Sequence, residues 1–498
     1  MSGRACTLFP RTLELLEPMH VVDGLMQTGW TGRTYAVYRD GEHVTRRAWQ
    51  SLLPLMDNSF HNYVLNIRQK RSEEIFAARY KTQFDRAVYH GWEIVAYKID
   101  TSLGDGYNIT ADISHVSLGQ RAVRWWVRID GRMKTNMPET NLAFGSIESQ
   151  THGNVLWVKL DRDAHRIGFA LTPSLQAKYP DGLTQEDVVR EATESLKPFT
   201  LEIERVDWWT QYNVRQKVAT TFQKDEFVLL AGDAAHTHSS AFAQGMNTGV
   251  HDATNLAWKL SGALKGWYQR ATLETYSSER RAAALKLISI DRLAASAVSG
   301  DIPTEYQRPG LTAEDALHSI FETNMNFTIG LGVSYDEVAS VLHTTPTATT
   351  LLPGTRSPDA LLHAPGPRVP FRLHDITHRD SNDRWSLLVF AGSYHRTKPR
   401  FVELRDKATA SGSRIARWNH LLTFSTIILD TVGSAWEAFD GPALGKLYFD
   451  TDSLAHDRYG VYSDHGAIVV VRPDGVFAFA AALEDLSNVE DYFAGICA

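Results

Sequence analysis

A short apolar run that stops at a glycine and is followed by a long helical pattern constrains this chain more than any other feature. Residues 227–231 (FVLLA) are continuously apolar, which is typical of a strand buried on both faces of a sheet, and they end at Gly232-Asp233. From Met246 onward, apolar residues recur on one face of a helix until Gly266 supplies a stop. We therefore expect an α/β arrangement in which a ligand can lie at the end of this strand.

The segments before this run predict helices first and then antiparallel strands. Residues 10–26 suggest one helix followed by another, and residues 92–113 read as two strands around Asp105-Gly106, a pair that suits a tight hairpin. Further strands are expected at 121–129, 155–160 and 167–171, and a strand-like segment starts at 201. A helix at 184–197 is predicted from Thr184 and Asp187, whose spacing fits a capping box.

The composition changes near the start of the last third of the chain. Residues 344–370 are rich in Thr, Pro and Gly, which marks a domain boundary or a connecting arm. After it, four strand-like segments (WSLLVFAG, TIILD, AIVVVRPDG and VFAFAAA) alternate with helical stretches, as expected for a separate sheet-and-helix domain. A long second helix, at 271–296, precedes this boundary.

The bulk composition excludes several classes of function. The chain has 498 residues, 51 Lys and Arg against 58 Asp and Glu, and a net charge of -7, so it shows no basic footprint for nucleic acid. Cys6 and Cys497 are too few for a disulfide framework. No apolar stretch reaches the roughly 20 residues of a membrane helix. We expect a soluble cytoplasmic protein with a small-molecule partner.

One segment resembles a known flavin-binding motif. Residues 232–259 (GDAAHTHSSAFAQGMNTGVHDATNLAWK) are similar to the second flavin-binding fingerprint of the FAD-dependent aromatic-ring hydroxylases. The resemblance is specific to the phenol 2-monooxygenase branch, and it runs from GRACTLFPRTLELL at the start to VVVRPDGVFAFAAALED near the end. It implies a partial doubly wound FAD-binding domain with an antiparallel substrate-binding sheet, plus a C-terminal thioredoxin-like domain.

The resemblance also implies a domain division. Residues 1–340 would be the FAD- and substrate-binding region, with 1–113 and 205–300 as its FAD part and 114–204 as its substrate sheet. Residues 341–369 would be a linker, and residues 370–498 would be the thioredoxin-like domain, through which the family forms homodimers. Like the family domain, this one contains no CxxC.

The function implied is hydroxylation of a phenolic or polycyclic aromatic substrate with FAD, NADPH and O2, in secondary metabolism or aromatic catabolism. Tyr212 matches the family tyrosine that lies at the flavin and the substrate phenol, which makes it the expected catalytic residue. The alternative for Tyr212 is packing on a neighbouring tryptophan. The residues expected to bind the cofactor are Tyr212, Gly232, Asp233, Gln244, Gly245, Met246 and Asn247.

The chain departs from the family in three places. It contains no GxGxxG pattern, so we expect it to be truncated at its N-terminus relative to the family, through either a gene-model error or real loss. Cys6 stands where the family has a catalytic aspartate, and Ser240 and Ala243 replace a proline and a glycine. These departures motivate an alternative function: a catalytically impaired or non-catalytic dimerising protein.

Other conspicuous residues have simpler readings. His236, His238 and His251 are read as features of the flavin fingerprint, and no metal is expected. Trp125 and Trp126, with nearby arginines, fit a substrate pocket as well as a sheet core. The charged run Glu279–Arg281 is expected to form salt bridges in the FAD domain.

Overall fold

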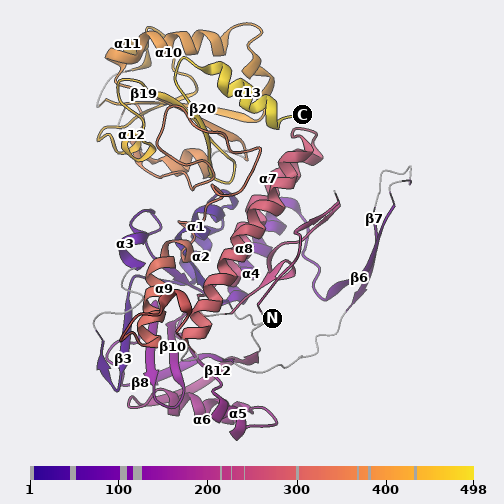
Figure 1. Cartoon of the computed structure of the whole chain (residues 1–498), viewed down its shortest axis with the longest axis vertical. Coiled ribbons are helices and arrows are strands. Elements are labelled where there is room, and N and C mark those ends of the chain that lie inside the picture. The colour runs from indigo at the N-terminus through magenta and orange to yellow at the C-terminus, as the bar shows by residue number, and fades with distance from the viewer. Residues whose placement is uncertain are drawn as a thin grey trace.

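The chain has a mixed α/β architecture, as expected from its sequence. The computed structural model describes residues 5–44, 52–100, 102, 109–115, 126–212, 216–225, 227–239, 242–298, 302–366, 369–379, 383–430 and 434–498. Figure 1 shows a C-terminal sheet-and-helix domain at one end of the molecule and a second large sheet at the other end, with long helices between them. No helix in the described ranges is both long and apolar enough to span a bilayer.

The sheet at the lower end of Figure 1 has seven strands. In spatial order they are β12 (Leu201–Tyr212), β8 (Trp126–Thr135), β11 (Ala164–Ala170), β10 (Gly153–Lys159), β9 (Phe144–Ser149), β3 (Tyr35–Arg39) and β4 (Glu42–His43). All neighbours are antiparallel except β3 and β9, which are parallel. The sheet draws β3 and β4 from the predicted FAD part, and β12 crosses the predicted division at 204/205.

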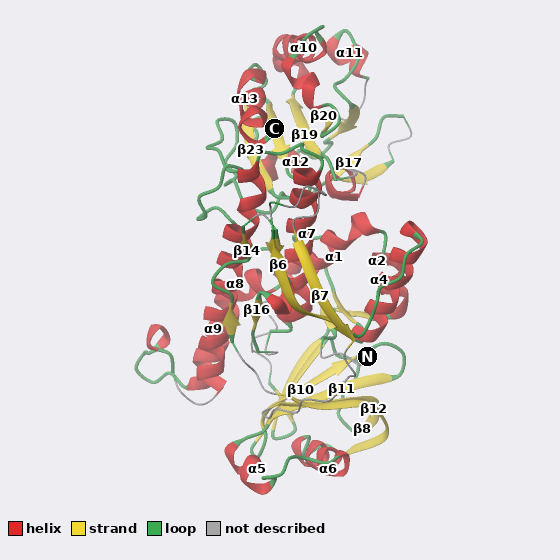
Figure 2. Cartoon of the chain, turned by 90° about the vertical axis from the view of Figure 1, so that its right-hand side faces the viewer, coloured by secondary structure: helices red, strands yellow, loops and turns green. Residues whose placement is uncertain are grey.

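One face of this sheet is covered by helices α5 (Pro173–Lys178) and α6 (Gln185–Ser195), which lie below it in Figure 2. Val188 and Ala192 of α6 join the hydrophobic core formed with Trp157 and Phe169 of the sheet. The predicted capping box is confirmed: Thr184 accepts a hydrogen bond from the backbone of Asp187, and the Asp187 side chain accepts one from the backbone of Thr184.

The N-terminal residues form a small second sheet. Strand β5 (Val64–Asn66) lies between β1 (Thr7–Leu8) and β2 (Trp30–Gly32). The helices predicted over 10–26 are present as α1 (Pro10–Leu16) and α2 (Val22–Thr28), and α3 (Leu52–Met56) and α4 (Gln69–Phe84) follow. Leucines of α1 and α2 pack with Leu65 and Ile67 in one buried cluster.

Three long helices run through the middle of the molecule. They are α7 (Gln244–Leu264), α8 (Arg270–Val298) and α9 (Ala313–Thr328), and the first two confirm the helices predicted from periodicity. Beside them, β13 (Lys217–Val218) pairs with β16 (His236–Thr237), and β14 (Gln223–Lys224) pairs with β15 (Val228–Leu229).

The expectation of a strand buried on both faces at 227–231 is wrong. Strand β15 is only two residues long, its side chains are half-buried, and it pairs with β14 in an antiparallel hairpin. Within the described ranges no parallel strand lies beside β15. Its apolar side chains are therefore covered from fewer directions than those of a central parallel strand.

The two strands predicted within 92–113 form an antiparallel ribbon, β6 (Trp92–Ile99) with β7 (Ile109–His115), that stands apart from the body of the molecule in Figure 1. The proposed Asp105-Gly106 turn lies outside the described residues. A bulge between Ile94 and Ala96 shifts the register by one residue. Because side chains alternate along a strand, this shift keeps Trp92, Ile94, Tyr97 and Ile99 on one face of the ribbon.

The C-terminal domain is a second seven-stranded sheet. Its order is β18 (Pro370–Arg372), β17 (Leu361–His363), β21 (Lys446–Phe449), β20 (Leu422–Ile428), β19 (Trp385–Gly392), β22 (Ala467–Val471) and β23 (Phe477–Ala481). Parallel strands β19 and β20 flank helix α10 (Tyr394–Thr409), and antiparallel strands β22 and β23 lead into α13 (Leu486–Ile496). This β-α-β and β-β-α order confirms the thioredoxin-like arrangement. Strand β17 lies inside the segment predicted as a linker.

Candidate functional site

The turn at Gly232 and the beginning of helix α7 lie against each other. Residues Gly232–Ala234 form a single 3-10 turn, in which Gly232 has a φ of 59°, a left-handed conformation that favours glycine. A Cβ atom on Gly232 would lie 3.9 Å from the Cα of Gly249 in α7. The Gly232 turn and α7 therefore lie side by side, and both belong to the segment that resembles the flavin-binding fingerprint.

Asp252 in α7 holds the Gly232 turn in place. Its carboxylate accepts a hydrogen bond from the Gly232 backbone N–H at 2.9 Å and lies 2.8 Å from Nε2 of His236. Its other oxygen accepts from Nε of Arg280 in α8 at 2.7 Å. The Asp252 side chain is fully buried. Burial alone would raise the pKa of Asp252, but Arg280 and His236 outweigh it and lower this pKa to about 2.

The first turn of α7 has free hydrogen-bond donors. The preceding residue, Ala243, makes no side-chain cap, so the backbone N–H groups of Gln244, Gly245 and Met246 have no partner within the helix. Apart from the neighbouring residues and the backbone of α7 itself, no atom of the described residues lies within 4 Å of the position that a Cβ would take on Gly245. Amides at the positive end of a 21-residue helix can receive an electron-rich group.

Asp233 supplies an acceptor in the turn that Asp252 holds against α7. Its side chain is exposed, and it makes no hydrogen bond or ion pair with any other described residue. A carboxylate of this kind can accept hydrogen bonds from the hydroxyl groups of a ligand.

Ala243 is strained at the junction between loop and helix. Its φ of 54° lies in the left-handed region, which costs a residue with a Cβ roughly 1–2 kcal/mol. The resemblance places a glycine within this loop. The left-handed backbone at this position gives the physical reason that glycine suits it.

Two of the predicted binding residues use their side chains to anchor α7. The Asn247 side-chain oxygen accepts from the Phe9 backbone N–H at 3.0 Å and from the Thr12 hydroxyl at 2.7 Å. The Gln244 side chain donates to the backbone carbonyl of Thr328. Both side chains are buried. These anchors leave the backbone amide of Gln244, rather than either side chain, for a ligand.

Tyr212 lies at the end of the edge strand β12, where it pairs with Trp126 of β8. Its side chain, along with Trp125 and Ser240, falls outside the described residues. The guanidinium of Arg128 lies 4.9 Å from the centre of the Trp126 ring, a cation–π contact at the end of the sheet.

Cys6 does not lie among these polar groups. It is buried in a hydrophobic cluster that includes Phe9 and Phe144, and its Sγ lies 3.5 Å from the Thr7 hydroxyl. A thiol in such surroundings behaves as a small apolar side chain.

The residues that organise the site form a pattern that could have been found in the sequence. Asp252, Asn255 and Lys259 are spaced three and four residues apart, so they form one polar stripe on a helix whose neighbours are apolar. All three are buried. A polar stripe on the buried face of a helix signals charged partners elsewhere, and the run Glu279–Arg281 supplies two of them, as predicted.

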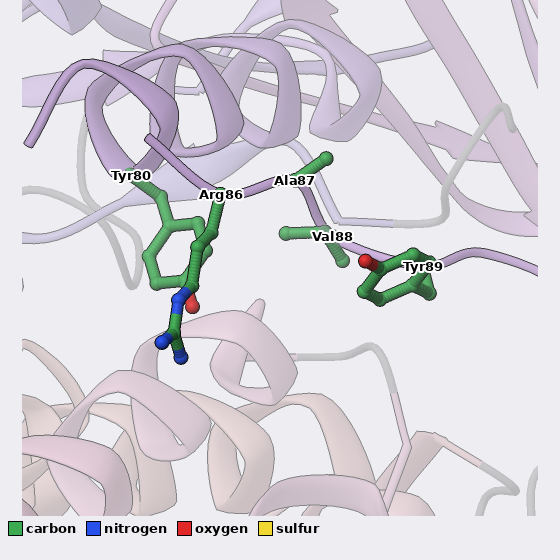
Figure 3. Close-up of a pocket in the computed structure, with 5 residues that line it drawn as sticks. All are labelled: Tyr80, Arg86, Ala87, Val88 and Tyr89. Carbon is green, nitrogen blue, oxygen red and sulfur yellow. The ribbon is translucent and has the colours of Figure 1, made fainter. Parts of the chain in front are cut away.

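A surface hollow of about 480 Å³ lies elsewhere, where α4 ends. Figure 3 shows its lining residues Tyr80, Arg86, Ala87, Val88 and Tyr89. None of the residues predicted to bind a cofactor lines it, so it is separate from the site at Gly232.

Two known family models match parts of the chain. Residues 161–290 match the FAD binding domain family, and residues 333–498 match the phenol hydroxylase C-terminal dimerisation domain family. The second match begins in the loop that follows α9, and it includes the predicted linker.

Known proteins with similar sequences are flavin enzymes. The chain is 30% identical over 390 residues to phenol 2-monooxygenase fsqG of Aspergillus fumigatus, covering 73% of this chain and 63% of that protein. It is 25% identical over 430 residues to FAD-dependent monooxygenase hkm7 of Aspergillus hancockii, covering 82% of this chain and 78% of the relative. The chain thus spans less than two thirds of the length of the first relative.

Solved structures share the fold. The flavin-dependent monooxygenase PieE, in complex with FAD and substrate, has a TM-score of 0.69 and 17% identity, with coverage of 99% of this chain and 93% of that one. A ternary complex of aklavinone-11 hydroxylase with FAD and aklavinone has a TM-score of 0.66 and 17% identity, with coverage of 98% and 91%.

Proposed function

Because the chain belongs to the FAD-dependent aromatic hydroxylase family, we propose that it is a monooxygenase that hydroxylates a phenolic or polycyclic aromatic compound with FAD, NADPH and O2. We place it in secondary metabolite biosynthesis. One observation carries the proposal: Asp252 of α7 accepts a hydrogen bond from the Gly232 backbone, which ties the turn that contains the exposed Asp233 carboxylate to the helix that begins without a side-chain cap.

The described residues fit the flavin and ribityl part of FAD. Asp233 would accept hydrogen bonds from ribityl hydroxyls, and the amides of Gln244, Gly245 and Met246 would donate to the polar edge of the isoalloxazine ring. Gly232 and Gly249 let the loop and the helix approach closely enough for both contacts. When bound, FAD supplies the redox chemistry by which NADPH and O2 hydroxylate a ring.

The protein's own part is to hold the flavin and to orient the substrate beside it. Asp252 and Asn247 fix the loop and the first turn of α7 before a ligand arrives, so little ordering remains to be done on binding. We assign Tyr212, at the end of β12, to the substrate side, where its hydroxyl would contact the phenol and the flavin. We further propose that the C-terminal domain forms a homodimer.

A second candidate function rests on one specific observation. Cys6 is buried in an apolar cluster at the position where the resemblance places a catalytic carboxylate. A non-catalytic dimerising protein descended from such an enzyme would account for it.

Purification with added FAD tests the proposal. We expect a yellow protein with a bound-flavin spectrum, and NADPH oxidation that phenols accelerate. Asp233→Asn should weaken FAD binding roughly tenfold, because a hydrogen bond to a charged group is worth more than one to an amide. Tyr212→Phe should lower the rate of hydroxylation while FAD still binds. A colourless folded dimer that ignores FAD would contradict the proposal and favour the second candidate.

A further inference from the structure

Helix α7 extends from the candidate flavin site into the core of the C-terminal domain. It begins beside the Gly232 turn, and its 21 residues span about 30 Å. Near its other end, Trp258 packs edge-on against Trp385 of β19, with 5.4 Å between the ring centres. Trp258 belongs to the main hydrophobic cluster of the C-terminal domain. Figure 1 shows α7 running between the two parts of the molecule. The single helix α7 is therefore part of both the candidate flavin site and the core of the C-terminal domain.

A fully buried ionic cluster lies next to Trp258, in the second half of this helix. The carboxylate of Glu279 in α8 accepts two hydrogen bonds from the Arg472 guanidinium, at 2.8 and 3.0 Å. It also accepts from Lys259 Nζ at 2.7 Å and from Asn255 Nδ2 at 2.8 Å, both in α7. Glu279, Arg472 and Lys259 have no exposed surface.

Arg472 belongs to the turn RPDG, residues 472–475, which joins β22 to β23 of the C-terminal domain. Its guanidinium also donates to Asp474 at 2.9 and 2.6 Å. The Asp474 carbonyl in turn accepts from Arg11 of α1 at 2.7 Å. The tip of one β-turn thus contacts α1, α7 and α8.

The formal charges of Lys259, Glu279, Arg472 and Asp474 cancel. A neutral, fully hydrogen-bonded cluster is tolerated in a protein interior, whereas the same cluster without one member contains a buried charge that nothing compensates. Any displacement of the turn from α7 and α8 would separate these buried charged partners.

This cluster lies next to the groups that hold the candidate site. Asn255 is three residues from Asp252, which binds the Gly232 turn, and Glu279 is adjacent to Arg280, which also binds Asp252. The cluster around Glu279 and the Asp252–Arg280 pair therefore share the helices α7 and α8. A shift of either helix at Glu279 would also move Asp252 or Arg280.

We propose that the Arg472–Gly475 turn of the C-terminal domain is a positioning element for the flavin-binding end of α7. The C-terminal domain then does more than join two copies of the chain, because it sets the distance between the Gly232 turn and the first turn of α7. The affinity for FAD would depend on a residue far from the flavin. The FAD-affinity part of this inference rests on the proposed function, whereas the control of α7 does not.

Three variants of the full chain separate positioning from folding. Arg472→Met removes the hydrogen bonds between the turn and Glu279, and it leaves the Asp474 carboxylate without the Arg472 cation. The double variant Arg472→Met/Asp474→Asn also removes these hydrogen bonds but keeps the cluster neutral, because Lys259 and Glu279 remain paired. Arg472→Lys keeps the charge without the two-pronged geometry. Arg414→Met is the matched control, since it breaks a partly exposed pair with Asp491 in the same domain.

Hydrogen exchange of the FAD-free protein is the first measurement. We expect the double variant to exchange at least about tenfold faster than the wild type within residues 232–252, with unchanged protection in β10 and β11. Arg472→Lys should be intermediate, and Arg414→Met should match the wild type. Unchanged exchange at 232–252 in the double variant would overturn the proposal. So would an equal loss of protection throughout the chain, because the turn would then support the whole fold rather than α7.

FAD titration, followed by flavin fluorescence, is the second measurement. The double variant should bind FAD at least about tenfold more weakly than the wild type, with partial recovery in Arg472→Lys. Equal affinities of the double variant and the wild type would overturn the link to FAD. If the wild type itself binds no FAD, the proposed function fails, and the exchange experiment still decides whether the turn positions α7.

Discussion

Replacing Asp252 by Asn tests whether this residue is the structural centre of the site. The change preserves the volume of the side chain but removes the charge that faces the buried Arg280 guanidinium. Removing one partner of a buried ion pair costs about 3–5 kcal/mol. The single remaining carbonyl oxygen can serve either Gly232 or Arg280, so one of these N–H groups also loses its acceptor.

The pH dependence gives an independent estimate of how much the ionised Asp252 side chain stabilises the fold. The pKa of Asp252 is lowered from 3.8 to about 2, so ionised Asp252 stabilises the fold at neutral pH by about 2 kcal/mol. The sign follows from the direction of the shift. Because the pKa is lower in the folded state, this stabilisation is present above pH 4 and is lost as the pH falls toward 2. The Asn variant should lack that part of the acid destabilisation.

Urea denaturation followed by tryptophan fluorescence measures the effect. We expect Asp252→Asn to lower the free energy of unfolding by about 2–5 kcal/mol at pH 7. The matched control is Asp233→Asn, in which an exposed and unpaired carboxylate is changed and the loss should stay within about 0.5 kcal/mol. A loss below about 1 kcal/mol in Asp252→Asn would refute the reasoning, because burying a guanidinium without a counter-charge costs more free energy than that.

Two further predictions concern other parts of the fold. Burial raises the pKa of Asp359 from 3.8 to about 7, so the wild type should lose up to about 4 kcal/mol of stability as the pH rises from 4 to 7. Asp359→Asn should flatten that dependence and be more stable than the wild type at pH 8, and urea titrations at pH 5 and pH 8 that show parallel curves would count against it. Thr184→Ala removes the capping box of α6 and should cost about 1 kcal/mol, as should Thr312→Ala, which removes the equivalent box of α9. Urea midpoints indistinguishable from that of the wild type would show that these caps contribute nothing.

Local elements of this protein follow from its sequence. The capping box at Thr184, the helices α7 and α8, and strands such as β19 and β10 were all predicted by patterns of neighbouring residues. Each of these patterns depends on contacts within a few positions along the chain, and those contacts are the same whatever the rest of the molecule does. The resemblance of residues 232–259 to a flavin-binding fingerprint was also visible in the sequence.

The burial of β15, by contrast, could not be predicted from the local sequence. Its apolar run is compatible with a central parallel strand, but whether such a strand is covered depends on which segments pair with it. In the described residues it pairs with β14 alone, and it stays half-buried. Likewise, β3 and β4 joined the large sheet through a pairing with β9 across more than a hundred positions of sequence, which no local pattern encodes.

The roles of the charged residues were decided entirely by tertiary structure. The sequence by itself determined that Asp252 and Lys259 share a helix face, and that Arg472 lies in a turn between two strands. It did not determine that Arg472 meets Glu279, 193 positions away. An ion pair between distant segments exists only once the packing of several helices and sheets has brought both charges out of water into the same place, and the free energy of that packing is spread over hundreds of contacts that single residues do not reveal.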